Sequence, residues 1–344
     1  MRSHRKLSRK LAHEQLAIRP DSSIVARLFR KKELLERNDP EHAKIRTLLI
    51  VLGGGLRGVS GGGAVVALDS LGLNKVFDIA IGASAGSPNT AYFLTGEEKV
   101  RIGTSIYYDE LRGRRFINLW RLTEIANIDW LGKTFAEGEK KLDVATVLSH
   151  RTKFMIALTD YIDGSTNLFD VKDYPDGVVR MVQISCAIPF LYRRPLRFDG
   201  RRYVDGSVAF SVRRTLESSF ITSFAPTDVV VITNTEETDV PTGGGDAIEW
   251  LAAVFSHHFE RLLLRRIQLA DDLEYLAARA GHGVNIGVIG SPPIESSVGN
   301  LTTDPMRLWH LGDATLQYVL RSFGKPELYK PLILPKDENL VGSP

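Results

Sequence analysis

Residues 77–89 contain the pattern that most constrains how this chain can fold. A short apolar run, Ile79-Ala80-Ile81, leads into Gly82-Ala83-Ser84-Ala85-Gly86, and residues 87–94 are compatible with a helix. A buried strand, a sharp turn and a helix form a nucleophile elbow, in which two glycines permit the bend that exposes the serine hydroxyl. The pattern therefore predicts Ser84 as a nucleophile, with Gly82 and Gly86 as the elbow glycines.

A second apolar run, residues 47–52, ends in a glycine-rich loop that reads Gly53-Gly54-Gly55-Leu56-Arg57-Gly58. Acyl transfer needs backbone N–H groups that point at a developing oxyanion, and glycines leave those groups uncovered. We expect Gly53, Gly54 and Gly55, together with the N–H of Ala85, to form the oxyanion hole. Arg57 and Gly58 are expected to support the loop, or Arg57 to meet a phosphate.

The same loop also fits a G-x-G-x-x-G dinucleotide fingerprint through Gly53, Gly55 and Gly58. That motif requires an acidic residue at the end of the next strand to bind the ribose. Here the next strand ends at Gly82, and Asp78 lies at its beginning. Nucleotide binding is therefore the less favoured interpretation.

A third motif lies far downstream, where Asp205-Gly206-Ser207 follows a short strand-like run. Together with the glycine loop, the elbow and the segment Ser185-Cys186-Ala187-Ile188-Pro189, it resembles the patatin-like phospholipases over residues 45–208. One departure is Ser207, because the family usually has Gly or Ala at that position. The resemblance implies a three-layer α/β sandwich with a mainly parallel sheet, which agrees with the alternation of strands and helices from Ile45 onward.

The resemblance also implies a Ser–Asp dyad in which Asp205 takes the proton from Ser84. An aspartate with an ordinary pKa near ~3.9 is a weak base, so a dyad needs a carboxylate that is partly shielded from water. The alternative is a Ser-His-Asp triad, for which a histidine follows the acid in the chain. The histidines available for that role are His257, His258, His282 and His310.

The basic character of the chain belongs to its N-terminal segment. Residues 1–44 carry twelve Lys/Arg and six Asp/Glu, a net charge of +6, whereas the whole chain has +3. Residues 22–36 have the spacing of an amphipathic helix, which can lie on an anionic membrane surface. The alternative, which we favour, is an arm packed on the body. Contact with nucleic acid is not expected, because the aromatic residues that stack on bases are missing there.

The rest of the chain is interpreted as one catalytic domain, residues 45–330, with a Pro-rich tail at 331–344. Residues 97–141 interrupt the alternation as an insertion rich in aromatic residues and arginines, which either lines an acyl-chain site or forms a helical cap. The other expected elements are helices at 64–71, 178–185, 246–280 and 305–324, strands at 153–158, 165–169, 228–233 and 284–289, and two short strands within 196–204.

Composition sets further limits on the class of protein. The chain is 43% hydrophobic and 25% charged, with no apolar run near the ~20 residues that span a membrane. No apolar segment follows the basic N-terminus, so a secretory signal is not expected, and a single cysteine, Cys186, fits a reducing compartment. We expect a cytoplasmic protein, in part peripheral at the membrane, with no metal or other cofactor. Its oligomeric state cannot be read from the sequence.

These patterns predict a serine acyl hydrolase that cleaves lipid esters, phospholipids in particular. Ser84 is the expected nucleophile and Asp205 the expected base. The alternative of a different class is a catalytically silent lipid-binding or regulatory protein that keeps the fold. Labelling of Ser84 by a fluorophosphonate distinguishes the two.

Overall fold

The computed structural model describes residues 12, 14–118, 120–121, 124–189, 191–236, 260–293 and 298–336. Within these residues, eight strands form one sheet in the order β5-β6-β3-β2-β1-β7-β8, and β4 pairs with β3 outside that path. The strands are β1 (Thr47–Val51), β2 (Ile79–Ala83), β3 (Lys153–Asp160), β4 (Thr166–Asp170), β5 (Leu196–Phe198), β6 (Arg201–Val204), β7 (Asp228–Glu236) and β8 (Asn285–Ser291).

The centre of the sheet is parallel and one side of it is antiparallel. Strands β3, β2, β1, β7 and β8 pair in parallel, whereas β4 and β6 run antiparallel to β3, and β5 runs antiparallel to β6. The central strands are buried on both faces, which explains their nearly continuous Val/Ile/Leu composition. The fold is therefore the expected α/β sandwich with a mainly parallel sheet.

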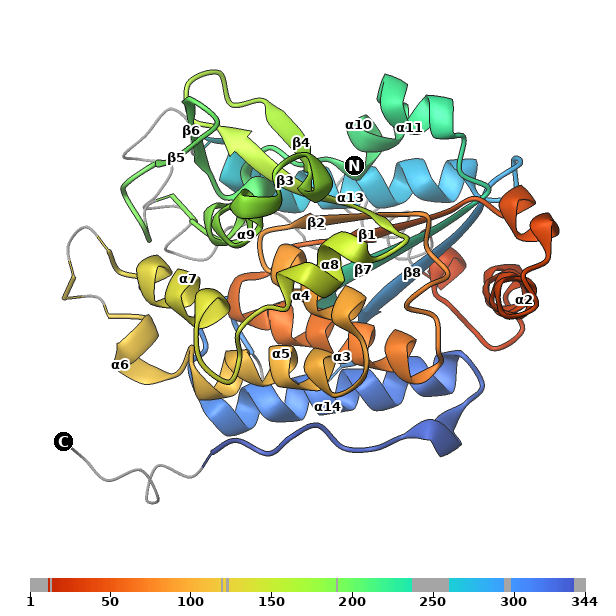
Figure 1. Ribbon diagram of the computed structural model, residues 1–344, viewed down its shortest axis with the longest axis horizontal. Coiled ribbons are helices and arrows are strands. Elements are labelled where there is room, and N and C mark those ends of the chain that lie inside the picture. Colours follow the sequence, from red (N-terminus) through yellow and green to blue (C-terminus); the bar gives the residue numbers. More distant parts are fainter. Residues whose placement is uncertain are drawn as a thin grey trace, which may run out of the picture.

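Alternate residues of each central strand enter two separate cores. Leu49 and Val51 of β1 pack into one core, and Leu48 and Ile50 pack into the other. The first core is covered by α3 (Gly58–Ser70), α4 (Gly86–Thr95), α5 (Glu97–Asp109), α9 (Val178–Ser185) and α14 (Pro305–Ser322). The second is covered by α10 (Val212–Glu217), α11 (Ser219–Phe224) and α13 (Glu260–Arg279). Figure 1 shows these helix layers on opposite sides of the sheet.

The described part of the N-terminal arm packs on the body. Helix α2 (Ser23–Glu36) buries Ile24, Val25 and Leu28 in the first core. Lys31, which is fully buried, forms an ion pair with Asp78 at the start of β2, and Arg27 pairs with Asp228 at the start of β7 at 2.6 Å. Residues 1–11, which carry much of the basic charge, lie outside the described residues.

Most expected elements are present, but α3 begins earlier than predicted. It starts at Gly58, not at Ala64, and therefore contains Gly61, Gly62 and Gly63. A Cβ on Gly63 would lie 2.1 Å from the carbonyl oxygen of Gly312 in α14, so close helix packing requires glycine there. The first part of the helix predicted for 246–280 lies outside the described residues, as do residues 337–344 of the predicted tail.

Several side chains of segment 97–141 are buried in the hydrophobic core of the domain. Helix α5 packs beside α3 and α4, and Tyr108 on it is fully buried. Two further helices, α6 (Gly113–Phe116) and α7 (Ile128–Ala136), flank a loop that projects from the body (Figure 1). The remaining helix of this region is α8 (Val144–Ser149). No helix in the described ranges is both long and apolar enough to cross a membrane.

Candidate active site

The predicted elbow has the expected strand, turn and helix. Ser84 lies between β2 and α4 and has a φ of 54°, a left-handed conformation that is strained for a residue with a side chain. Neither elbow glycine tolerates a Cβ, which would lie 2.6 Å from Ser87 Cα at Gly82 and 1.9 Å from the carbonyl oxygen of Val51 at Gly86. The tight packing explains why both positions are glycine.

Ser185 holds the elbow in place. Its Oγ accepts a hydrogen bond from the Ser84 backbone N–H at 2.9 Å and donates to the carbonyl oxygen of Ala157 in β3 at 2.9 Å. The Ser87 hydroxyl lies 2.8 Å from the same oxygen. Ser185 was noticed in the sequence only as part of a family-like segment, and its role in fixing the strained Ser84 backbone could not be seen there.

The Ser84 hydroxyl donates a hydrogen bond to Asp205 Oδ2 at 2.6 Å. Both residues are buried, each with an exposed fraction of 2%. Asp205 follows β6 and precedes the short 3-10 helix η5 (Gly206–Val208), and its Oδ1 accepts the N–H of Ser207 at 2.7 Å. One carboxylate oxygen is thus held by the backbone while the other contacts the serine.

The glycine loop reaches the same place because β1 and β2 are parallel neighbours. Val51 is paired with Gly82, so the residues after each strand emerge at one edge of the sheet. A Cβ on Gly53 would lie 2.5 Å from Ser84 Cβ, so the loop contacts the nucleophile directly. The backbone N–H groups of Gly53, Gly54, Gly55 and Ala85 have no hydrogen-bond acceptor within the described part of the chain.

Two asparagines that the sequence did not single out fix this loop. Asn234, at the end of β7, donates to the carbonyl oxygen of Leu52 at 2.7 Å and accepts the N–H of Gly61 at 2.8 Å. Asn89 on α4 donates to the carbonyl oxygen of Gly58 at 2.8 Å. Both contacts join residues far apart in the chain, so no local pattern could have indicated them.

Tyr107 links the elbow to α5. Its hydroxyl donates to Asn89 Oδ1 at 3.1 Å and to the carbonyl oxygen of Ala85 at 3.3 Å. Burial raises the pKa of Tyr107, which keeps the phenol neutral and a donor. A Cβ on Gly58 would meet Ala85 Cβ at 2.4 Å, which explains the glycine between these groups.

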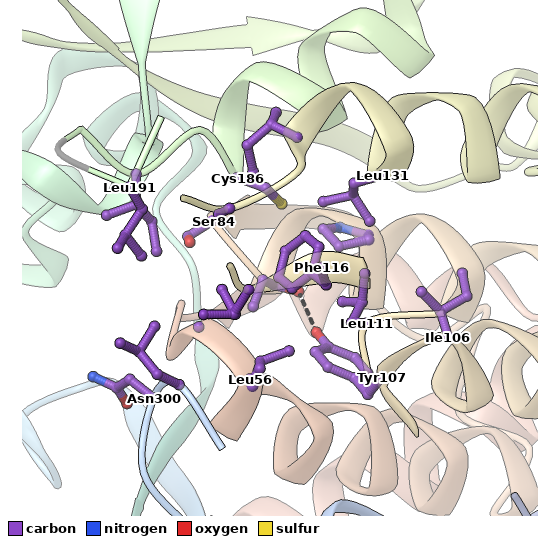
Figure 2. Close-up of a pocket in the computed structure, with 18 of the residues that line it drawn as sticks. Leu56, Ser84, Ile106, Tyr107, Leu111, Phe116, Leu131, Cys186, Leu191 and Asn300 are labelled. Atoms are coloured by element: carbon purple, nitrogen blue, oxygen red, sulfur yellow. Dashed lines mark hydrogen bonds between the residues drawn. The ribbon is translucent and has the colours of Figure 1, made fainter. Parts of the chain in front are cut away.

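An apolar pocket opens beside Ser84 (Figure 2). Its wall combines α5, α6, α7 and the segment after α9, and Ser84 and Ala85 lie at its edge. The apolar side chains that line it are those of Leu56, Ile106, Leu111, Phe116, Ile117, Ile128, Leu131, Phe135, Ile188, Leu191 and Leu301. Several aromatic residues of segment 97–141 therefore line a pocket, whereas Tyr108 belongs to the core. Arg57 ends the 3-10 helix η2 (Gly55–Arg57), is half-buried, and is not one of the lining residues.

Cys186 lies in the pocket wall, where Figure 2 shows its sulfur among the lining side chains. Burial, and to a lesser extent the negative charge of Asp205, raises the pKa of its thiol. A neutral thiol is a poor nucleophile, so the residue acts as a packed apolar group.

The described histidines of the triad alternative lie elsewhere. His310 on α14 lines a separate cavity with Pro292 and Asp313, and His282 is in the turn between α13 and β8. His257 and His258 lie outside the described residues. In the part of the chain that the structure covers, no group of three or more His, Cys, Asp or Glu is arranged to hold a metal ion.

Comparisons with known proteins identify one family-model match and one similar solved structure. The sequence model of the family described as Patatin-like phospholipase matches residues 49–214, a range that includes the glycine loop, Ser84 and Asp205. Among solved structures, VipD from Legionella pneumophila is similar, with a TM-score of 0.37 and 13% identity, and the match covers 80% of this chain and 66% of that chain. No curated protein matches the sequence. Residues 49–214 therefore form a patatin-like phospholipase domain, which indicates a lipid acyl hydrolase.

Proposed function

We propose that the protein hydrolyses acyl ester bonds of lipids, with Ser84 as the nucleophile and Asp205 as the base. The observation that carries the proposal is the 2.6 Å hydrogen bond from Ser84 Oγ to Asp205 Oδ2 beside an apolar pocket. The strained Ser84 backbone adds support, because such strain concentrates at functional sites.

In the first half of the reaction, Ser84 Oγ attacks the ester carbonyl carbon while its proton passes to Asp205 Oδ2. The carbonyl oxygen becomes an oxyanion, which the open N–H groups of Gly54, Gly55 and Ala85 are suited to bind. Helix α4 begins at Gly86, so the positive end of its dipole favours the same negative charge. When the C–O bond breaks, the leaving alkoxide takes the proton from Asp205 and the acyl group stays on Ser84.

In the second half, a water molecule attacks the acyl-enzyme and gives a proton to Asp205. The tetrahedral intermediate then collapses, the free fatty acid leaves, and Asp205 returns its proton to Ser84 Oγ. The hydrogen bond from the Ser207 N–H to Oδ1 keeps Oδ2 directed at the serine through both halves.

The pocket supports an acyl chain as the part of the substrate that is buried. Its lining is almost entirely aliphatic or aromatic, and burying apolar surface there is favourable. We propose a phospholipid as the substrate because of the family match. Arg57 is the candidate for contact with the phosphate or for support of the loop.

The test combines covalent labelling with turnover. A fluorophosphonate probe should label the wild type at Ser84, and Ser84→Ala should lose both labelling and hydrolysis of a p-nitrophenyl acyl ester. Ser70→Ala, which removes a hydroxyl bonded only within α3, is the matched control and should behave as wild type. Retained turnover in Ser84→Ala would refute the proposal. Binding of fatty acid without labelling or turnover in the wild type would instead favour the silent lipid-binding alternative.

A further inference from the structure

The loop of residues 112–126 forms one side of the pocket. Ile117 and Ala126 pair across it as an antiparallel bridge, and both line the pocket together with Phe116. The segment 191–194 lies alongside, because Glu124 is bridged to Tyr192 and the Ala126 N–H donates to the carbonyl oxygen of Leu191 at 2.9 Å. Figure 1 shows the loop between α6 and α7 extending away from the body.

Trp120, in this loop, has a highly exposed side chain. Its exposed fraction is 85%, the highest among the exposed large hydrophobic residues of the described chain. Exposed indole rings are unfavourable in water but well suited to the boundary between lipid headgroups and acyl chains. An exposed tryptophan on a loop that lines an apolar pocket therefore indicates contact with an amphipathic surface.

The segments that carry Trp120 and its neighbours are rich in positive charge. The loop contains four arginines, Arg112, Arg114, Arg115 and Arg121, against one acidic residue, Glu124, and the neighbouring segment adds Arg193 and Arg194. The side chains at 114, 115, 193 and 194 are exposed. Residues 1–44 have a net charge of +6 and the whole chain has +3, so residues 45–344 sum to −3. The loop and residues 191–194 therefore form a basic patch on a body that is otherwise negatively charged.

The arginines are held in place by local contacts. Arg121 donates to the carbonyl oxygens of Arg114 and Arg115 at 3.0 and 3.1 Å. The Arg115 guanidinium stacks 3.7 Å from the centre of the Trp130 ring. These contacts join Arg121, next to Trp120, to the exposed arginines before it.

We propose that residues 112–118, 120–121, 124–126 and 191–194 form a docking surface for an anionic lipid bilayer. Trp120 inserts at the level of the headgroups, the arginines contact lipid phosphates, and the pocket beside Ser84 then faces the membrane. The proposal rests on the proposed function in one respect, namely that the docked lipid is also the substrate. A single-stranded nucleic acid would offer charge and bases that stack on Trp120, but only a lipid also matches the apolar pocket that this loop lines, so the bilayer is the better match.

The experiment measures binding in a Ser84→Ala background, so that vesicles stay intact whatever the activity. The probes are vesicles of phosphatidylcholine alone and of phosphatidylcholine with 30% phosphatidylglycerol, assayed by co-sedimentation. Trp120→Ala should weaken partitioning into the anionic vesicles by about tenfold. Arg114→Gln combined with Arg193→Gln should weaken it by about tenfold or more, and high salt should abolish the difference.

Two matched controls remove similar groups elsewhere. Ile162→Ala trims a 70% exposed apolar side chain in the β3–β4 turn, and Arg321→Gln with Lys325→Gln removes two exposed charges near the end of α14. Both should bind as the parent does. Three results would overturn the proposal. They are equal losses of binding in the control variants, unchanged vesicle binding by Trp120→Ala, and binding to single-stranded nucleic acid in place of vesicles.

Hydrolysis of a soluble ester tests the proposed function independently of the docking surface. In the active background, Trp120→Ala should hydrolyse a short-chain p-nitrophenyl ester at the wild-type rate but cleave vesicle phospholipid about tenfold more slowly. If the wild type hydrolyses neither substrate yet binds anionic vesicles through Trp120, the catalytic proposal fails and the docking surface stands.

Discussion

The Ser84 hydroxyl touches the Asp205 carboxylate directly, with 2.6 Å between Oγ and Oδ2. In a Ser-His-Asp triad, an imidazole separates the serine from the acid and carries the proton between them. Our proposal of a Ser–Asp dyad, in which the carboxylate itself takes the proton from Ser84, rests on this direct contact. It also sets the strongest test of the mechanism.

Asp205→Asn should lower kcat by about 10²–10⁴-fold, because the amide keeps the size of the side chain but cannot act as a base. The matched control is Asp199→Asn, which changes the other Asp-Gly pair of the same region, in an exposed turn. His→Ala changes at 257, 258, 282 and 310 should each retain most activity. A histidine variant as inactive as Ser84→Ala would show that a triad operates. The Ser84→Ala, Asp205→Asn double variant should be no slower than either single one, since the two residues act as a unit.

Gly53→Ala should lower kcat by about 10²–10³-fold, as expected when an oxyanion site is disturbed. The added Cβ would meet Ser84 Cβ at 2.5 Å and Ser207 Oγ at 2.4 Å, so the nucleophile must move away from Asp205. Gly299→Ala is the control, because its Cβ would meet only Thr302 Oγ1, at 3.6 Å. Thermal unfolding checks that Gly53→Ala is folded. A folded Gly53→Ala enzyme with wild-type kcat would contradict the assigned role of this loop.

Lys31→Ala should destabilise the protein by about 1–3 kcal/mol, the cost of losing buried hydrogen bonds, because Asp78 is partly exposed and keeps its ion pair with Arg151 at 3.1 Å. Lys31 is fully buried and bonds Asp78 and Thr47, and burial lowers its pKa to about 8. Arg30→Ala, which breaks an exposed pair with Glu33, should cost less than about 1 kcal/mol. Urea unfolding measures both. A cost for Lys31→Ala as small as that for Arg30→Ala would mean that α2 contributes little to the fold.

This contact also changes how the arm can be studied. Deleting residues 1–40 would remove α2 together with Lys31, and so would test folding as much as membrane binding. Shorter deletions within residues 1–11 leave the described contacts of α2 intact.

The parts of the fold that the sequence predicted are those encoded locally. The apolar runs at 47–52 and 79–81, each followed by glycines, predicted strands β1 and β2 and the loops after them. The predicted start of α3 was wrong because three successive glycines normally weaken a helix. Packing explains them, since a Cβ would meet Asn234 and Asn89 at Gly61, Thr104 of α5 at Gly62, and Gly312 of α14 at Gly63. Packing against residues distant in the sequence therefore allows α3 to begin at Gly58.

The same distinction holds at the site. Ser84 and Asp205 were predicted because each lies in a recognisable motif, and the structure brings them into contact. Ser185, Asn234 and Asn89 could not be predicted, because each stabilises the backbone of a segment distant in sequence. Residue type alone carries no signal for such long-range hydrogen bonds.

Acid should destabilise the protein partly through His150. Burial, together with the positive charges of Lys75, Arg151 and Lys172, lowers the pKa of His150 from 6.5 to about 4. Its Nδ1 accepts the Thr152 N–H at 3.2 Å, a bond that protonation there would break. The imidazole of residue 150 binds a proton more readily in the unfolded chain than in the folded one. The stability gained by keeping it neutral is therefore fully present above pH 6.5 and is lost as the pH falls to 4. The loss approaches about 3 kcal/mol.

Urea unfolding at pH 7.5 and at pH 4.5 tests this contribution. His150→Asn keeps an acceptor near the position of Nδ1 but does not titrate, so its stability should change less between the two pH values. If wild type and variant lose the same stability over that range, His150 is not responsible for the acid sensitivity.

Ser207→Ala should stabilise the protein while leaving catalysis nearly unchanged. The Ser207 hydroxyl is buried next to Gly53, and its oxygen has no hydrogen-bond partner among the residues that the structure describes. Leaving a buried polar group unsatisfied costs about 1–3 kcal/mol, so removing it should raise the free energy of unfolding by a similar amount. The backbone N–H of residue 207, which holds Asp205 Oδ1, is kept in the variant.

The matched comparison is Ser185→Ala, which removes a buried hydroxyl that has three partners. That change should destabilise the protein by about 1–3 kcal/mol and lower kcat, because the Ser84 N–H loses its acceptor. Urea unfolding and kcat/KM on a soluble ester separate the two serines. A folded Ser207→Ala variant that loses more than about tenfold in kcat, a change equivalent to ~1.4 kcal/mol, would show that the reaction itself uses this hydroxyl. The lack of a described hydrogen-bond partner for this hydroxyl would then serve catalysis, and the stability it costs would be explained by that role.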